Sequence, residues 1–217
     1  MAEIFLFDLD GTLTESGTGI VNSVAYALKH FKIPVSDEKK ELYRFIGPSL
    51  KDAFSGFYGL DEEQTLEAIR VYREYYTRQG MFENRVYKGV EEMLSSLEVK
   101  GKRLMVATSK PEIYARQILD HFHLSSYFTF IGGSLMSETR TDKTEVIRYV
   151  FESTGITNVS QAVMVGDRYY DMIGAKNAGV KRVGVLYGYG SREELEESGA
   201  DLLIESPMDL IRYADSL

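Results

Sequence analysis

Short apolar segments spaced along the chain are the feature that most constrains its fold. They are rich in Val, Ile, Leu and Phe and show little polar alternation, which is typical of strands covered on both faces. Helical patterns separate them, such as the apolar stripe of Val90, Met93, Leu94 and Leu97. Alternation of strands and helices predicts a doubly wound α/β core around a parallel sheet. The predicted strands are 4–10, 103–109, 127–133, 162–167 and 182–188, with a weaker one at 201–206.

The long interval between the first two strands interrupts this alternation. It contains no strand-like run, but three amphipathic helical patterns occur in it, the third carried by Leu66, Ile69, Tyr72 and Tyr76. We therefore expect an all-helical domain at 15–82, inserted after the first strand of a core formed by 1–14 and 83–217. Near the C-terminus, Ser191 and Glu194 have the spacing of a helix capping box.

Composition excludes several classes of function. The 217 residues carry a net charge of −8, which argues against broad binding to nucleic-acid phosphates. Without cysteine, the chain has no disulfide, thiolate nucleophile or Cys-based zinc site. No apolar run approaches the roughly 20 residues of a membrane span, and no secretory signal pattern opens the chain. A cytoplasmic protein with no membrane or nucleic-acid partner is expected.

Two pairs of carboxylates follow predicted strands. In "IFLFDLDG", Asp8 and Asp10 lie two apart, so they face one region of an extended segment before Gly11 allows a turn. In "VGDRYYD", Asp167 and Asp171 form a second acidic pair. Ligands of open parallel sheets bind at the carboxyl ends of strands, and two acidic pairs gathered there would repel each other without a cation. Oxygen donors and the absence of soft ligands favour Mg²⁺.

Two other segments supply hydroxyls and positive charge. In "ATSKPE", Thr108 and Ser109 end a predicted strand, and a helix is expected to begin near Lys110 and Pro111. Hydroxyls beside the free N–H groups of a helix start are suited to a phosphoryl group. Lys143 lies just ahead of an amphipathic helix. Each segment also has a structural interpretation, as helix caps for Thr108 and Ser109 and as a solvated surface residue for Lys143.

Together, "DLDGTLT", "ATSK", Lys143 in "TDKTE" and "GDRYYD" resemble the four motifs of the haloacid dehalogenase-like hydrolase superfamily, in that chain order. The resemblance covers essentially the whole chain, since the helical insertion matches the superfamily's small helical cap. The Gly-rich segment "VLYGYGSREEL" lacks the spacing of a nucleotide-binding loop and is expected to be a structural connection. It is similar to a segment of cap-bearing phosphatases related to phosphoglycolate phosphatases and 5′-nucleotidase-like members.

The resemblance implies catalytic roles. Asp8 would attack phosphorus and form an aspartyl-phosphate, and Asp10 would protonate the leaving alcohol and then activate water. Mg²⁺ would be held by the Asp8 carboxylate, the Asp10 backbone carbonyl and Asp167. Asp171 would support the ion through water or a hydrogen bond, or would serve only as a helix N-terminal charge.

Further residues complete the implied site. Lys143 would neutralise charge on the nucleophile and the phosphoryl oxygens. Thr108 and the Ser109 N–H would hold the phosphoryl group, and Thr12 would orient the first loop. In the helical insertion, "YRFIGPSLKDAF" contains Arg44, Gly47 and Lys51, which would contact a second anionic group of the substrate or else be ordinary surface residues.

Asp10 narrows the expected reaction, because dehalogenases, phosphonatases and transport ATPases of the superfamily lack an acid there. We expect a phosphatase acting on a small phosphomonoester, with phosphoglycolate-like metabolites and nucleoside 5′-monophosphates as leading classes. A sugar phosphomutase is the alternative, and a catalytically silent binding or regulatory protein is a further one. The expected assembly is a monomer or homodimer.

Overall fold

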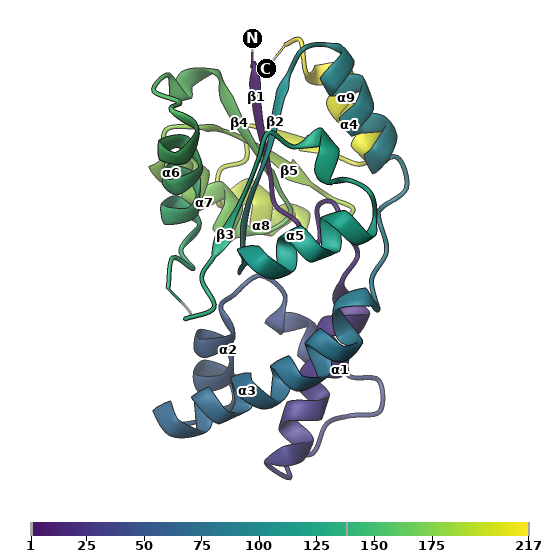
Figure 1. Cartoon of the computed structure of the whole chain (residues 1–217), viewed down its shortest axis with the longest axis vertical. Coiled ribbons are helices and arrows are strands. Elements are labelled where there is room, and N and C mark those ends of the chain that lie inside the picture. Colours follow the sequence, from purple (N-terminus) through teal and green to yellow (C-terminus); the bar gives the residue numbers. More distant parts are fainter. Residues whose placement is uncertain (1, 138, 217) are drawn as a thin grey trace. The chain divides into compact units, whose positions relative to one another are not determined.

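A six-stranded sheet forms the centre of the larger part of the molecule. The computed structural model describes residues 2–137 and 139–216, and within them the strand order is β3-β2-β1-β4-β5-β6 with every neighbouring pair parallel (Figure 1). The prediction of a doubly wound α/β core is confirmed. The strands are β1 (Ile4–Phe7), β2 (Arg103–Pro111), β3 (Phe130–Ser134), β4 (Ala162–Gly166), β5 (Lys181–Val185) and β6 (Leu202–Ile204).

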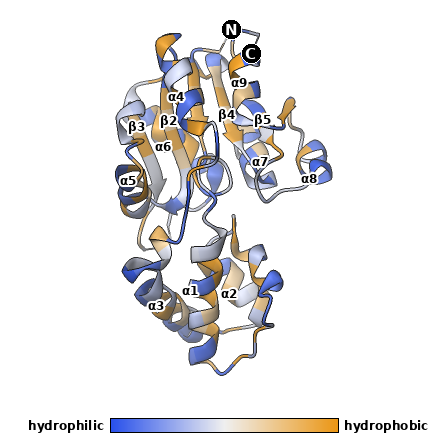
Figure 2. Cartoon of the chain, turned by 90° about the vertical axis from the view of Figure 1, so that its right-hand side faces the viewer, coloured by the Kyte–Doolittle hydropathy of each residue, from blue (hydrophilic) through white to orange (hydrophobic). Residues whose placement is uncertain are grey.

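Helices cover both faces of this sheet. On one face, Ile4 and Leu6 of β1 pack in a buried cluster with Val146 and Val150 of α6. Figure 1 shows α6 and α7 on one side of the sheet and α4 and α9 on the other. The strands are mostly hydrophobic and α8 is hydrophilic (Figure 2), as expected for a buried sheet and a surface helix. The helices of this part are α4 (Val90–Val99), α5 (Glu112–His121), α6 (Lys143–Thr154), α7 (Tyr169–Asn177), α8 (Arg192–Glu197) and α9 (Pro207–Tyr213), with short 3₁₀ turns η3 (Ser125–Tyr127) and η4 (Val159–Gln161).

Strand ends differ from the sequence-based prediction. β1 ends at Phe7, yet Leu9 and Leu13 in the following loop are completely buried. β3 begins at Phe130 because the preceding residues Ser125–Tyr127 form a 3₁₀ turn. Hydropathy alone overextends strands here because buried loops are as apolar as the strands they continue.

Contacts within the chain divide it into two compact units. The α/β unit comprises Met1–Thr14 and Val86–Leu217, and the helical unit comprises Glu15–Arg85. Residues just beyond 82 belong with the helical unit, since the Glu83 carboxylate accepts hydrogen bonds from Asn22 Nδ2 (2.8 Å) and the Tyr75 hydroxyl (2.9 Å). The Glu15 N–H also donates to the Arg85 carbonyl at 2.7 Å.

The helical unit packs around apolar faces of its three helices. Ser49 caps the start of α2 by accepting from the Asp52 N–H, and Asp61 with Gln64 forms a capping box at the start of α3. Close approach of α1 to η2 requires Gly19, because a Cβ there would lie 1.8 Å from the Gly80 carbonyl oxygen. The elements are α1 (Gly17–His30), η1 (Lys40–Phe45), α2 (Leu50–Tyr58), α3 (Glu62–Arg78) and η2 (Gly80–Phe82).

One residue of the predicted apolar stripe on α3 does not contribute to the core. Leu66 is 56% exposed, whereas Ile69, Tyr72 and Tyr76 are buried. Thr65 is buried in its place, with its hydroxyl donating to the Leu60 carbonyl at 3.3 Å. The stripe prediction was therefore wrong at Leu66.

No helix among residues 2–137 and 139–216 combines the length and apolarity needed to cross a bilayer.

The contrast between two leucines of the helical unit gives a stability prediction. Leu28→Ala on α1 removes a completely buried side chain and should lower the free energy of unfolding by about 2 to 5 kcal/mol. Leu66→Ala should change it by less than about 0.5 kcal/mol, because the side chain is exposed. Chemical denaturation followed by circular dichroism measures both. Equal losses for the two variants would contradict the assigned core.

Candidate active site

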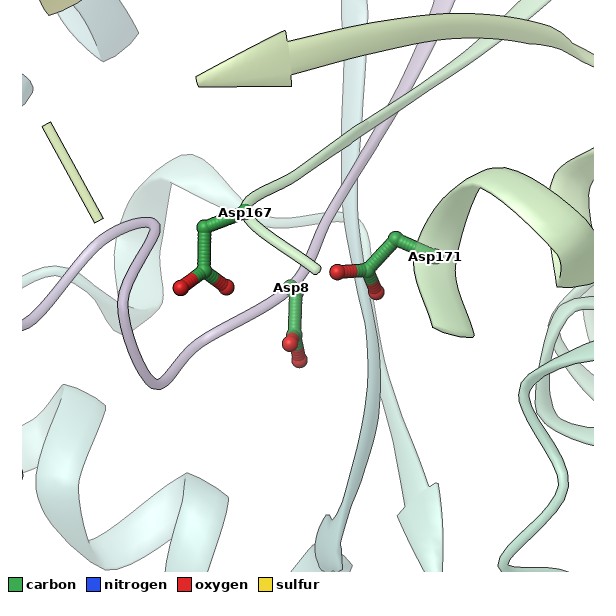
Figure 3. A group of neighbouring side chains, drawn as sticks. All are labelled: Asp8, Asp167 and Asp171. Atoms are coloured by element: carbon green, nitrogen blue, oxygen red, sulfur yellow. The ribbon is translucent and has the colours of Figure 1, made fainter. Parts of the chain in front are cut away.

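Three carboxylates converge at the carboxyl ends of two adjacent central strands. Asp8 follows β1, Asp167 follows β4, and Asp171 lies in the first turn of α7. One oxygen from each lies within 4.8 Å of the others, and the groups face a common region (Figure 3). Their exposed fractions are 8%, 0% and 1%. Because β1 and β4 pair in parallel, residues 159 positions apart in the chain are brought to one point.

Two glycines make room for these carboxylates. At Gly11, with φ of +83°, a Cβ would lie 2.1 Å from the Asp167 Oδ2 atom. At Gly166, a Cβ would lie 2.2 Å from the Asp171 carboxylate carbon. Any side chain at either position would occupy the space of an acidic group, so the cluster depends on both glycines.

Lys143 joins two of the three acids. Lys143 is the first residue of α6. Asp142 caps this helix start by accepting hydrogen bonds from the Thr144 N–H (2.9 Å) and the Glu145 N–H (3.2 Å). The Lys143 Nζ lies 3.0 Å from Asp8 Oδ1 and 2.8 Å from Asp171 Oδ1. It also donates to the carbonyl of Ala107 on β2 at 3.1 Å. Lys143 is buried and ion-paired, so its interpretation as a solvated surface residue was wrong.

Burial and mutual repulsion set the protonation of the cluster. Burial raises the pKa of Asp167 well above its usual range, and the charges of Asp171 and Asp8 raise it further. Burial likewise raises the pKa of Asp171 to about 6, although the Lys143 ammonium opposes this shift. Burial by itself would lower the pKa of Lys143, but the carboxylates of Asp171 and Asp8 raise it above its ordinary value. The lysine stays charged beside acids that resist ionising.

The cluster fits a divalent cation. When the three acids and Lys143 are all ionised, the group carries two uncompensated negative charges, which is the charge such an ion balances. The buried Asp167 Oδ1 has no hydrogen-bond partner among the described residues, and Oδ2 accepts only from the Tyr189 N–H, at 2.8 Å. Carboxylate oxygens with unfilled lone pairs are the donors that hard cations prefer. The donor set is therefore suited to a divalent metal.

The carboxylate of Asp10 lies apart from this cluster. Its Oδ2 atom is 2.7 Å from the Lys110 Nζ. The sequence pattern led to no predicted role for Lys110. β2 continues to Pro111, and α5 begins at Glu112, next to the helix start expected near Lys110 and Pro111. A charged residue directly after a Thr-Ser pair at a strand end was the available signal.

The predicted phosphoryl-binding residues lie on the neighbouring strand and the first loop. Thr108 is buried, and its Oγ1 accepts the Lys110 N–H at 3.2 Å, whereas Ser109 is half-buried. Thr12 is buried with an Oγ1 that has no partner within the described chain, and its carbonyl accepts the Tyr187 hydroxyl at 3.1 Å. Their contacts to a phosphoryl group stay predictions.

The Gly-rich loop after β5 packs directly against Asp167. A Cβ at Gly188 would lie 2.3 Å from the Asp167 Cβ, and the next residue, Tyr189, supplies the N–H donor to Asp167. The expected capping box beyond this loop is only half formed. Ser191 accepts the Glu194 N–H, but the Glu194 carboxylate accepts the Tyr169 N–H at 2.9 Å and so ties α8 to the start of α7.

The three candidate specificity residues belong to the helical unit, and two of them have partners there. The Arg44 guanidinium lies 4.4 Å from the Phe57 ring centroid. Lys51 Nζ lies 4.0 Å from Glu62 Oε1. Gly47 has a φ of +113°, a conformation that favours glycine, in the segment before α2. Their contacts with a substrate stay predictions.

Comparison with known proteins identifies the family. The family model described as haloacid dehalogenase-like hydrolase matches residues 5–185. The chain belongs to this family. The resemblance expected from the four motifs is confirmed, and so is the α/β core.

Relatives of this chain include several named enzymes. A 5′-nucleotidase of Pseudomonas aeruginosa is 45% identical over 190 residues, which cover 88% of this chain and 85% of that protein. The crystal structure of a predicted phosphatase from Clostridium acetobutylicum is 46% identical, covers 100% of both chains and has a TM-score of 0.96. The tyrosine-protein kinase PtkA of Mycobacterium tuberculosis is 35% identical over 213 residues, 98% of this chain and 72% of that protein. We conclude that the chain is an enzyme of the phosphatase group of the haloacid dehalogenase-like family.

The raised pKa of Asp167 leads to a prediction about metal-free protein. Asp167→Asn removes a buried charge that Asp8 and Asp171 repel, so the metal-free variant should be more stable than wild type at pH 7.5. Adding Mg²⁺ should raise the melting temperature of wild type and of the exposed control Asp37→Asn, but not that of Asp167→Asn. Differential scanning fluorimetry with and without a chelator measures this. An equal response of all three proteins would contradict a metal site at Asp167.

The same acids predict a dependence on pH. Their pKa values are raised in the folded state, so their protonated forms favour folding at low pH and this stabilisation is lost as the pH rises. In metal-free protein, the melting-temperature gap between Asp167→Asn and wild type should widen between about pH 4 and pH 7, the range that contains the Asp171 pKa of about 6. A gap that stays constant over this range would show that the cluster does not titrate as described.

Proposed function

We propose that this protein is a Mg²⁺-dependent phosphatase that hydrolyses small phosphomonoesters through an aspartyl-phosphate on Asp8. The observation that carries the proposal is the cluster of three buried carboxylates with Lys143 at the carboxyl ends of β1 and β4. It combines a candidate nucleophile, a place for a hard cation and a fixed positive charge. The family and its phosphatase relatives support the same reaction class.

Asp8 is the candidate nucleophile because it is the most accessible acid of the cluster and has one oxygen held by Lys143. The other oxygen attacks phosphorus, the bond from phosphorus to the ester oxygen breaks, and an acyl phosphate forms. Lys143 reduces the repulsion between the incoming phosphate and the carboxylate. Asp10 gives its proton to the departing alcohol oxygen.

In the second half-reaction, water attacks the phosphorus of the aspartyl-phosphate. Asp10, now a carboxylate, accepts a proton from that water, and the bond between phosphorus and the Asp8 oxygen breaks. Inorganic phosphate leaves, and Asp8 and Asp10 return to their starting forms. One acid thus serves both half-reactions, which suits its separate position beside the cluster.

Asp8, Asp167 and the Asp10 backbone carbonyl would hold the Mg²⁺, with Asp171 supporting it while paired to Lys143. The ion supplies Lewis-acid stabilisation of negative charge on the phosphoryl oxygens. Thr108 and the Ser109 N–H would bind those oxygens, and Thr12 would keep the first loop in place through its carbonyl contact with Tyr187.

Nucleoside 5′-monophosphates are the first substrate class to test, because the 45% identical relative is named a 5′-nucleotidase. Phosphoglycolate-like metabolites are the second class. We propose the helical unit as a cap that excludes water, with Arg44, Gly47 and Lys51 near a second anionic group of the substrate. A substrate would have to compete with the contacts of Arg44 to Phe57 and of Lys51 to Glu62. A cytoplasmic monomer or homodimer completes the proposal.

Phosphate release from a panel of esters tests the reaction. Wild type should release inorganic phosphate only with Mg²⁺ present, and Asp8→Asn should lower kcat/KM by at least about 10³-fold. Asp120→Asn, an exposed change in the same unit, should leave activity unchanged. Rapid acid quenching of wild type should trap phosphate on the protein, and Asp8→Asn should trap none.

Other outcomes separate the alternatives. Activity that survives Asp8→Asn or chelation would overturn the mechanism. Conversion of a phosphosugar only with a bisphosphate activator, and without phosphate release, would indicate a mutase. Transfer from ATP to a tyrosine polymer would indicate the activity for which the mycobacterial relative is named. Inactivity in every arm would favour a silent binding protein.

A further inference from the structure

Lys110 forms an ion pair with Asp10, and the reaction described above gives Lys110 no role. Its Nζ lies 2.7 Å from Asp10 Oδ2, and the two side chains are only 6% and 16% exposed. The other oxygen, Asp10 Oδ1, is buried without a hydrogen-bond partner in the described residues. The two oxygens of this acid are therefore in different surroundings.

The backbone holds Lys110 in place. The pairing of β2 with β3 shifts register between Ala107 and Pro111, so the intervening residues leave the regular ladder. Within this irregular stretch, the Lys110 N–H donates to Thr108 Oγ1. Gly133 of β3 allows the close contact, because a Cβ there would lie 2.5 Å from the Lys110 carbonyl oxygen. The position of Lys110 is thus determined by two neighbouring strands.

The two buried lysines divide the acids between them. Lys143 pairs with Asp8 and Asp171, which belong to the metal-type cluster, and Lys110 pairs with Asp10, whose carboxylate is outside that cluster. An acid whose carboxylate binds the metal is held in its ionised form and cannot act as the proton donor. The Lys110 pair keeps the Asp10 carboxylate out of the cluster.

An ammonium group can donate hydrogen bonds but cannot accept one. The oxygen that faces Lys110 must therefore act as an acceptor, and a proton on Asp10 must reside on Oδ1. We propose that Lys110 is a positioning residue that fixes which oxygen of Asp10 transfers the proton. This inference rests on the role proposed above for Asp10. Oδ1 gives its proton to the leaving alcohol oxygen and later takes one from the attacking water, while Oδ2 stays paired with Lys110.

A residue that acts through a general acid has a characteristic kinetic signature. An alkoxide leaving group needs a proton as its bond to phosphorus breaks, whereas p-nitrophenolate leaves readily without one. Lys110→Met should therefore lower kcat on an alkyl phosphate by roughly 10²-fold, the range expected when proton transfer is impaired. The loss on p-nitrophenyl phosphate should be less than about tenfold, with KM little changed for either ester.

Four further single variants and one double variant serve as matched comparisons. Asp10→Asn should show the same dependence on the leaving group, and adding Lys110→Met to it should cause little further loss. Lys143→Met, next to the nucleophile, should lower the rates on both esters to a similar extent. Lys110→Arg, which keeps a cationic donor, should retain much of the wild-type kcat on the alkyl phosphate. Lys88→Met, an exposed change in the same unit, should have no effect.

The outcomes separate this inference from the proposed function. If wild type releases phosphate and Asp8→Asn does not, but Lys110→Met loses the same factor on both esters, the positioning role is wrong and the phosphatase proposal stands. Additive losses for Lys110→Met and Asp10→Asn would overturn it as well. If wild type releases no phosphate from any ester, both proposals fall. Melting temperatures identify a folding defect in Lys110→Met. In that case Lys110→Gln takes its place, and it should lose rate on the alkyl phosphate while Lys110→Arg does not. Equal rates for Lys110→Arg and Lys110→Gln on the alkyl phosphate would overturn the positioning role.

Discussion

The buried ion pairs of Lys143 are the interaction on which the site depends. Without them, Asp8 and Asp171 would be two adjacent buried charges next to a third at Asp167, and removing one partner from such a group is costly, at about 3 to 5 kcal/mol. The lysine does not balance the whole charge. The negative charge that remains on the carboxylates suits a divalent cation.

The site also depends on three glycines that leave space for its charged side chains. Gly11 and Gly166 leave the space that the Asp167 and Asp171 carboxylates occupy, and Gly174 on α7 does the same for the stem of Lys143, where a Cβ would lie 2.6 Å from the lysine Cβ. Each glycine therefore lets a charged side chain pack closely against the backbone of another element. Preorganised charges of this kind need no rearrangement when a phosphate approaches, which is how electrostatic catalysis gains its effect.

Much of this arrangement could be predicted from the chain, and the errors have physical causes. Strand runs and acidic pairs are local patterns, so the parallel core and the grouping of Asp8 with Asp167 follow from sequence and from the rule that parallel strands end at one edge. The predicted burial of Leu66 was wrong because the apolar stripe of a helix does not show which residue at its edge packs against a neighbouring element. Lys110 was overlooked because the sequence does not show the irregular register of β2 or the ion pair that Lys110 forms with Asp10.

By itself, the sequence determined the order of elements, the family and the identity of the charged groups, because these depend on residue type and short spacing. Only the tertiary structure decided which charges meet. Lys143 and Lys110 are 33 positions apart and look equivalent as sequence, yet one pairs with Asp8 and Asp171 and the other with Asp10. This pairing depends on the order of the strands, on where α6 begins and on the space that the glycines leave. A buried ammonium group forms its ion pair with the carboxylate that the fold places within about 3 Å of it.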